Sequence, residues 1–271
     1  MNLQQALTAA TKKLSHLENP SLEAEVLLAT LLEKNRTWLK TYPEKTLTDT
    51  QQSQFNQWIK KRAEHMPSSY ITGTVNWNGL RLKVNKHTLI PRDETETLCH
   101  HIKEGQTITP RSILDVGTGS GCIAIWLSQQ YPQAGVTALD VSSPAVETAR
   151  GNQLPSQKIK FIESDMLNVL ESKDHYDLIV ANLPYVPDTL KVSPEVSQEP
   201  RSAIFSGNDG LDHIRTLATQ IIKKEMSFNQ LWLEFLPNQI EAITAIFDAY
   251  AVKPYRDVNG EIYFAQISPL A

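Results

Sequence analysis

The chain has 271 residues, 41% of them hydrophobic and 21% charged, with a formal net charge of −4. This length suffices for a large domain and a small one, and no apolar run approaches the roughly 20 residues that cross a bilayer. The acidic balance argues against wide contact with nucleic acid phosphates. Two cysteines, Cys99 and Cys122, give neither a disulfide framework nor a zinc site by their spacing. We therefore expect no metal, no membrane span and a reducing, cytoplasmic location.

The first part of the chain has the periodicity of helices. Apolar residues over 3–17 recur at the spacing of one helical face. Asn19-Pro20 marks the start of a second helix, and a third starts near 48–49. These helices predict a small bundle over residues 1–68. This bundle could bind a protein partner, or it could serve only in packing or solubility.

Between residues 69 and 88 the period changes from helical to alternating. Asn78 and Gly79 stand between two runs in which apolar and polar residues alternate. Asn-Gly in this position is a strong signal for a two-residue hairpin turn. We predict a β-hairpin that connects the helical bundle to the rest of the chain.

Strands and helices alternate over residues 89–271, the predicted catalytic domain. Strands are expected at 112–116, 135–140, 158–162, 177–181 and 230–235, with a final hairpin-like pair around 257–267. Helices are expected at 122–130, 143–152, from about 210, and 238–250. Such repeated βα units imply an α/β fold with a doubly wound, mostly parallel seven-stranded sheet. A ligand in this fold lies beyond the carboxyl ends of the strands, near the topological switch point.

Three glycines, Gly117, Gly119 and Gly121, follow the first of these strands and open a helix. Glycine here permits positive φ and lets the backbone approach a ligand closely. A nicotinamide fingerprint needs its third glycine one place later, where Cys122 stands. With Asp115 in the strand itself, the pattern resembles the first motif of the class I S-adenosylmethionine-dependent methyltransferases, which have a Rossmann-like fold.

That resemblance implies a cofactor site. An acid near the glycine loop suits the cationic amino-acid end of S-adenosylmethionine, Asp140 would accept hydrogen bonds from the ribose, and Asp165 would meet the adenine amino group. Each carboxylate alone could instead cap a helix or end a strand. The cofactor-binding residues implied are Asp115, Gly117, Thr118, Gly119, Ser120, Gly121, Asp140, Asp165 and Met166.

After the fourth strand comes Asn182-Leu183-Pro184-Tyr185, which resembles the segment of amino-group methyltransferases that holds a conjugated NH2 group. The Asn182 side-chain oxygen and the Pro184 carbonyl oxygen can each accept one N–H hydrogen and turn the nitrogen toward the methyl donor. Tyr185 can hold a flat substrate. We predict Asn182, Pro184 and Tyr185 as catalytic, all four residues as substrate-binding, and Asn182 also as a cofactor contact. A rigid loop in which Asn182 starts a turn is the alternative.

Over nearly its full length the chain resembles the peptide chain release factor glutamine N5-methyltransferases, the HemK or PrmC family. The most specific pieces are residues 89–96 and 199–215, which generic methyltransferases lack. The resemblance implies methyl transfer to the glutamine of the Gly-Gly-Gln motif in class I release factors, with the release factor docked on the N-terminal bundle. Two departures stand out, since the family usually has proline at the positions of Asp93 and Leu183.

The resemblance also implies roles for residues 92–95. Arg92, Glu94 and Thr95 would close over the methionine end of the cofactor. A plain helix start at 93–96 accounts for the same residues equally well.

A later segment is assigned in the same way. Glu199, Arg201 and the loop 207–210 would shape the substrate channel. An Arg–carboxylate pair that only braces the loop is the alternative.

Two other functions stay open. Asn-Leu-Pro-Tyr also occurs in ribosomal RNA adenine N6-dimethylases, but those enzymes place their extra helices after the catalytic core and carry a basic RNA face. A protein that binds S-adenosylmethionine without catalysis would be expected to lack Asn182. We expect no stable nucleic acid binding and a monomer.

Overall fold

The computed structural model describes residues 1–106 and 108–270 and divides into two compact units. The first comprises Met1–Thr74 together with Val192–Gln198, and the second comprises Val75–Lys191 together with the chain from Glu199 onward. The functions assigned to the predicted domains stay predictions. Over the described ranges, no helix is both long and apolar enough to cross a membrane.

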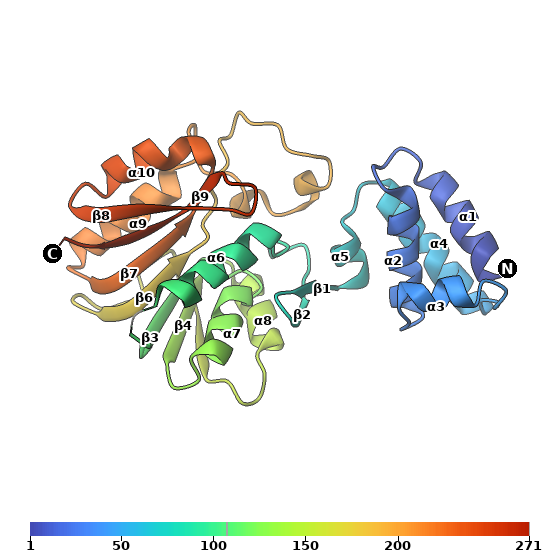
Figure 1. The fold of residues 1–271 in the computed structure, drawn as a ribbon, viewed down its shortest axis with the longest axis horizontal. Coiled ribbons are helices and arrows are strands. Elements are labelled where there is room, and N and C mark those ends of the chain that lie inside the picture. The colour runs from blue at the N-terminus through green and yellow to red at the C-terminus, as the bar shows by residue number, and fades with distance from the viewer. Residues whose placement is uncertain (107, 271) are drawn as a thin grey trace. The chain divides into compact units, whose positions relative to one another are not determined.

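The first unit is helical (Figure 1). A capping box starts α1, because the Asn2 side chain accepts from the Gln5 backbone at 2.8 Å and the Gln5 side chain accepts from the Asn2 backbone at 3.1 Å. Thr48 caps α4 in the same way. The six-residue α3 and five-residue α5 were not predicted, since such short helices show no clear period. The helices are α1 (Leu3–Lys13), α2 (Pro20–Leu31), α3 (Arg36–Thr41), α4 (Asp49–Ala63) and α5 (Ser68–Thr72).

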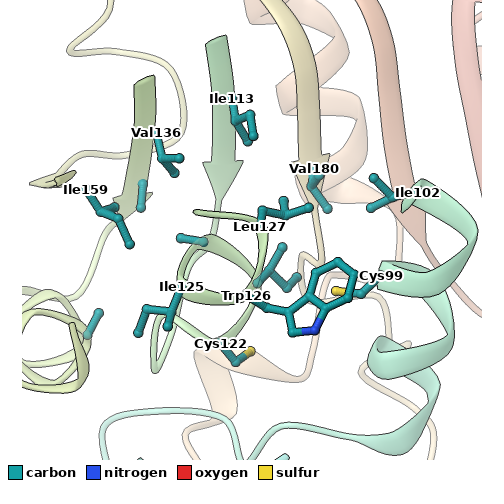
Figure 2. Close-up of a cluster of buried hydrophobic side chains, with 14 of the residues drawn as sticks. Cys99, Ile102, Ile113, Cys122, Ile125, Trp126, Leu127, Val136, Ile159 and Val180 are labelled. Carbon is teal, nitrogen blue, oxygen red and sulfur yellow. The ribbon is translucent and has the colours of Figure 1, made fainter. Parts of the chain in front are cut away.

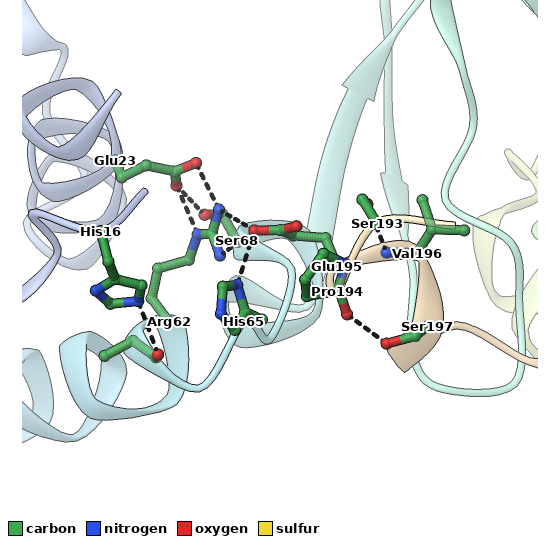
Figure 3. Close-up of polar contacts among 11 residues, drawn as sticks. His16, Glu23, Arg62, His65, Ser68, Ser193, Pro194, Glu195, Val196 and Ser197 are labelled. Carbon is green, nitrogen blue, oxygen red and sulfur yellow. Dashed lines mark hydrogen bonds and ion pairs between the residues drawn. The ribbon is translucent and has the colours of Figure 1, made fainter. Parts of the chain in front are cut away.

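A buried arginine ties the segment Val192–Gln198 to these helices (Figure 3). The Arg62 side chain is 7% exposed, donates to both carboxylate oxygens of Glu23 at 3.0 and 2.9 Å, and donates to Glu195 at 3.2 Å. Burial alone would raise the pKa of Glu23, but hydrogen bonds from Arg62 and Ser68 lower it below its ordinary value. This segment is therefore fixed by charge pairing to the α2 and α4 helices.

The second unit contains the sheet that the sequence predicts (Figure 1). Its strands are β1 (Thr74–Trp77), β2 (Leu80–Lys83), β3 (Ser112–Val116), β4 (Gly135–Asp140), β5 (Ile159–Glu163), β6 (His175–Ala181), β7 (Ser227–Glu234), β8 (Tyr250–Arg256) and β9 (Ile262–Pro269). Its helices are α6 (Asp93–Gly105), α7 (Cys122–Gln130), α8 (Ser143–Asn152), α9 (Asp212–Lys223) and α10 (Ile240–Ile246). The predicted seven-stranded α/β fold is confirmed. The last predicted helix is shorter than expected, because Tyr250 already begins β8.

The strand order creates one topological switch point. The seven strands run in the order β5-β4-β3-β6-β7-β9-β8, parallel from β5 to β7 and antiparallel from β7 through β9 to β8. The chain moves outward from β3 through β4 to β5 and then returns to the other side of β3 with β6. The carboxyl ends of β3 and β6 therefore lie side by side, where a ligand site is expected.

Two apolar layers cover the sheet. Helices α6, α7 and α8 pack on one face and helices α9 and α10 on the other (Figure 1). Successive side chains of β3 point to opposite faces of the sheet, so Ile113 belongs to the first layer and Leu114 to the second. Both cysteines, Cys99 and Cys122, are buried and unpaired in the first layer beside Trp126 (Figure 2).

The predicted hairpin is confirmed as a separate two-stranded sheet of β1 and β2. Its turn residues Asn78 and Gly79 both have positive φ, of 46° and 78°. A type I′ turn requires this conformation at both positions, which explains the Asn-Gly pair.

Candidate active site

The switch point brings the glycine loop and the Asn-Leu-Pro-Tyr segment together. Val116, the last residue of β3, pairs with Ala181, the last residue of β6. The loop of Gly117 and the segment that starts at Asn182 therefore leave the sheet at the same edge. A Cβ on Gly117 would lie 3.1 Å from the Leu183 side chain, so the two motifs are in contact.

The glycine loop is held open by backbone hydrogen bonds. The amides of Gly117 and Thr118 both donate to the carbonyl of Leu139 at 2.8 Å. Gly119 has a φ of 56°, and a Cβ there would meet no protein atom within 4 Å. The backbone at Gly119 thus faces open space, as a closely approached ligand requires.

Asp115 braces this loop from inside the protein. It is 0% exposed, and one carboxylate oxygen accepts from the Thr118 hydroxyl at 2.7 Å and the Ala124 amide at 3.2 Å. Its other oxygen has no hydrogen-bond partner among the described residues. Burial raises the pKa of Asp115 to about 7, although these two hydrogen bonds lower it. Asp115 positions the loop rather than bordering the pocket.

Asp140, the last residue of β4, connects the glycine loop to the start of α8. Its carboxylate accepts from the Gly119 amide at 2.8 Å and from the Ser142 amide at 2.9 Å. Burial raises the pKa of Asp140, and the two backbone bonds act in the opposite direction. Both oxygens retain further acceptor capacity toward the pocket.

A pocket of about 230 Å³ opens at this edge of the sheet. Eleven predicted site residues line it: Thr95, Gly117, Thr118, Gly119, Ser120, Asp140, Asp165, Met166, Asn182, Leu183 and Pro184. Within the described part of the chain, Asp115, Gly121, Arg92 and Tyr185 are not among its lining residues. Sequence reasoning missed several lining residues, including His87, Cys122, Ser164, Ser202 and His213.

The pocket suits S-adenosylmethionine. The open backbone at Gly119 leaves room for the cofactor, and the Asp140 and Asp165 carboxylates offer acceptors to hydroxyl and amino groups. Met166 has a φ of 49°, a conformation held by a hydrogen bond of 2.8 Å from the Ser164 hydroxyl to its carbonyl. The predicted adenine-side residues are thus fixed in the wall of the pocket.

The Asn182 side chain belongs to a hydrogen-bond chain. Its Nδ2 donates to the Thr95 hydroxyl oxygen at 2.9 Å, and the Thr95 hydroxyl donates to Glu234 at 2.9 Å. The Tyr185 hydroxyl donates to the other oxygen of Glu234 at 3.0 Å. Among the described residues, no hydrogen bond reaches Asn182 Oδ1 or the Pro184 carbonyl oxygen. Two acceptors are therefore available at the pocket.

Glu234 is a further residue near the pocket that sequence reasoning missed. It is 1% exposed at the end of β7. Burial raises its pKa to about 7, while hydrogen bonds from Thr95, Tyr185 and Asn182 lower it. The sequence does contain one signal for Glu234, because it is an acidic residue at the carboxyl end of a predicted buried strand. Since β7 lies parallel to β6, both strands end at the edge of the sheet where a ligand site is expected.

Residues 92–95 contain the start of a helix, whereas their expected contact with the cofactor stays a prediction. Helix α6 starts at Asp93, and its first turn points the buried Thr95 at Asn182. Arg92 instead forms an ion pair with Glu199, which also accepts from the Ile90 amide at 2.9 Å. Arg92 therefore braces the chain ahead of the helix.

Glu199 and Arg201 each form an Arg–carboxylate pair, but with different partners. Arg201 pairs with Asp188 at 2.6 Å, whereas Glu199 pairs with Arg92. Glu199 is buried and Arg201 is exposed, so the two side chains point to different partners.

The loop 207–210 supports the Asn-Leu-Pro-Tyr segment. A Cβ on Gly210 would overlap the Tyr185 carbonyl oxygen. Gln239 donates to that same oxygen and to the Asp209 carbonyl, both at 2.8 Å. Tyr185 is thus held by Glu234 at its hydroxyl and by Gln239 at its backbone.

Two family models match this chain. A family model described as the PrmC N-terminal domain matches residues 5–73, and one described as the methyltransferase small domain matches residues 93–200. A methyltransferase structure from Pyrococcus furiosus has a TM-score of 0.51 at 16% identity, covering 82% of this chain and 98% of that one. The fold and the glycine loop define a Rossmann-like methyltransferase.

Relatives identify the family. A release factor glutamine methyltransferase of Koribacter versatilis is 40% identical over 232 residues, which cover 82% of this chain and 81% of that protein. One of Deinococcus radiodurans is 36% identical over 252 residues, which cover 90% of both chains. The chain belongs to the release factor glutamine methyltransferase family. The family resemblance drawn from the sequence is confirmed.

Proposed function

We propose that this protein transfers the methyl group of S-adenosylmethionine to the side-chain amide nitrogen of the glutamine in the Gly-Gly-Gln motif of class I release factors, and so modulates translation termination. The pair of acceptors after β6, Asn182 Oδ1 and the Pro184 carbonyl oxygen, carries the proposal. Two acceptors match the two N–H groups of a primary amide. Membership in the family points to glutamine as the amide that enters.

The chemistry needs positioning more than proton transfer. An amide nitrogen is a poor nucleophile because its lone pair is delocalised into the carbonyl group. Asn182 and Pro184 would each accept a hydrogen bond from one of its two N–H groups. These bonds would fix the orientation of the nitrogen and stabilise the positive charge that develops on it. S-adenosylmethionine, when bound, supplies an electrophilic methyl group. The protonated product is strongly acidic and can release its proton to water, so no general base is required.

Residues of the pocket would hold the cofactor. We assign the glycine loop at 117–120 and Asp140 to this role, with Asp165 and Met166 at the adenine. Asp115 would act through the loop that it braces, and Thr95 through Asn182. Tyr185 would support the substrate segment, since its hydroxyl is already bonded to Glu234.

The N-terminal helices would bind the body of the release factor. This role is consistent with the separate core of the first unit and with its match to the PrmC N-terminal domain. We expect the enzyme to act as a cytoplasmic monomer, which ultracentrifugation of the protein alone and with a release factor would test.

One labelling experiment tests the proposed substrate. The purified protein and cofactor with a labelled methyl group are offered to a class I release factor, to the same factor with Gln→Ala in its Gly-Gly-Gln motif, and to ribosomal RNA. We expect label in the intact factor alone. Label in the RNA would support the adenine alternative, and equal label in both factors would place methylation at another residue. Either result would overturn the proposal.

A further inference from the structure

We propose that Thr95 and Glu234 position the Asn182 side chain, holding its NH2 group inward so that its oxygen faces the substrate nitrogen. The inference rests on the proposed function and extends it to two residues that do not touch the substrate. It gives Thr95 a task different from the cofactor contact expected from its sequence motif.

The direction of each hydrogen bond follows from the number of available protons. The Thr95 hydroxyl has one proton and donates it to Glu234 at 2.9 Å. The Thr95 oxygen must then act as acceptor toward Asn182, whose nearest side-chain atom lies 2.9 Å away. Only the NH2 group of Asn182 can donate to it. Rotating the amide by 180° would place two oxygens against each other with no proton between them.

Glu234 sets this direction because it accepts on both oxygens. Thr95 donates to one oxygen and Tyr185 to the other. Across the described residues, no lysine, arginine or histidine forms an ion pair with Glu234. The buried charge is therefore stabilised by these neutral donors together with Asn182. An ionised carboxylate cannot donate, so it fixes the Thr95 proton and, through it, the orientation of the Asn182 amide.

The orientation decides whether the substrate nitrogen meets an acceptor or a donor. With the NH2 group of Asn182 held by Thr95, Oδ1 remains for the N–H group of the substrate. A reversed Asn182 amide would place its own NH2 group against the N–H group of the substrate. Because neither group can accept, the substrate nitrogen would be displaced from its reacting position. Misplacement on the scale of 1 Å costs about 100-fold in rate. Because Glu234 still faces Asn182 when Thr95 is changed, we expect a loss of about 10-fold or more.

The primary test compares three threonine variants. Thr95→Val keeps the shape but removes the hydroxyl, and we expect kcat to fall about 10-fold or more while KM for the release factor changes about 2-fold or less. Thr95→Ser restores the hydroxyl and should recover most of the lost turnover. Thr97→Val is the matched control, because Thr97 lies in the same helix and bonds only its own turn.

A double variant separates positioning from general destabilisation. If Thr95 acts through Asn182, adding Thr95→Val to Asn182→Ala should lower kcat by 2-fold or less beyond the single Asn182→Ala change. Equal losses in both backgrounds would show that Thr95 acts independently of Asn182 and would overturn the inference. So would a kcat for Thr95→Val within about 2-fold of wild type.

The pH profile gives a second readout. With a pKa raised to about 7, Glu234 is ionised above that pH, so kcat should rise with pH through about 7. Glu94, Cys99, Cys122, Tyr185 and Tyr263 are the titratable groups that interact with Glu234. Glu234→Gln keeps one acceptor oxygen without the titration of Glu234, so its kcat should rise less through pH 7 than that of the wild type, while Asp115 still titrates in this range. A Gln variant with the wild-type profile would contradict the role of Glu234.

An activity-independent measurement uses the protein without cofactor or substrate. In protein with ¹⁵N-labelled asparagine, the Asn182 NH2 signals are assigned by their loss in Asn182→Ala. We expect slow hydrogen exchange of these protons in the wild type and faster exchange in Thr95→Val. Exchange as fast as that of the exposed Asn229 in the wild type would overturn the inference without any variant. Absence of release factor methylation would refute the proposed function but leave this measurement decisive for the positioning.

Discussion

Leu183 packs directly beneath Gly117. A Cβ built on Gly117 would lie 3.1 Å from Leu183 Cδ2, and Leu183 is itself buried in the layer that contains α9 and α10. Leu183, which departs from the usual family sequence, therefore contacts the glycine loop with its side chain while its backbone continues into Pro184. The contact explains how leucine can stand at this position, since its side chain fills the space under the loop.

Leu183→Ala should weaken both the fold and the cofactor site. Removing a buried leucine side chain typically costs about 2–5 kcal/mol, and the cavity would lie next to Gly117. We expect the free energy of unfolding to fall by that amount in urea denaturation and the affinity for S-adenosylhomocysteine to fall in calorimetry. Leu190→Ala, at a half-exposed leucine, is the control and should change neither. Unaltered affinity in a destabilised Leu183→Ala protein would show that the loop does not depend on this contact.

Gly119→Ala should affect binding more than stability. The φ of 56° costs an alanine about 1 kcal/mol, and the new methyl group would meet no protein atom within 4 Å. It would instead occupy space at the wall of the pocket. We expect the affinity for S-adenosylhomocysteine to fall about 10-fold or more by calorimetry, with a loss of about 1 kcal/mol in unfolding free energy. Gly151→Ala, at an exposed helical glycine, should leave both near wild type, and a similar affinity in the two variants would contradict this reading.

The predictable part of the site is the part that is local in sequence. The loop at 117–121 and the segment at 182–185 each follow a buried strand within a few residues, so their type and place could be read directly. Glu234 could not, because it lies 52 positions beyond Asn182 (234 minus 182) and reaches it only through the order of strands β6 and β7. Thr95 was predicted as a cofactor contact, whereas in the structure its hydroxyl oxygen accepts a hydrogen bond from Asn182. Nothing in the sequence indicates that contact, because the two residues lie in different motifs.

The helical unit shows the same limit. Helices α1, α2 and α4 are long enough for their apolar faces to appear in the sequence, whereas α3 has only six residues. The association of Val192–Gln198 with this unit had no local signal either. It depends on Arg62 and Glu195, which are separated by 133 positions and joined by a hydrogen bond of 3.2 Å.

Asp115 should make stability depend on pH. Its pKa is about 7 in the folded protein and about 3.8 in the unfolded chain, so its contribution is complete below about pH 4 and disappears as pH rises through about 7. Asp115→Asn removes this titration. Relative to wild type, the variant should gain on the order of a few kcal/mol between pH 4 and pH 8. Urea denaturation across this range without cofactor would measure it, and a constant difference between the two proteins would contradict it. Glu234 titrates in the same window, so part of the slope should remain in the variant.

Asn182→Ala should separate cofactor binding from methyl transfer. The change removes one of the two acceptors for the substrate amide but leaves the glycine loop and Asp140 intact. Loss of one preorganised transition-state contact typically costs about 100-fold or more in kcat. We expect a loss of this size in a labelled-methyl assay with a release factor, while the affinity for S-adenosylhomocysteine stays within a few-fold of wild type in calorimetry. Asn229→Ala is the matched control, since Asn229 lies at the opposite end of β7 and bonds Asp177. Near-normal turnover by Asn182→Ala would show that the Pro184 carbonyl alone orients the nitrogen, and the two-acceptor mechanism would then be wrong.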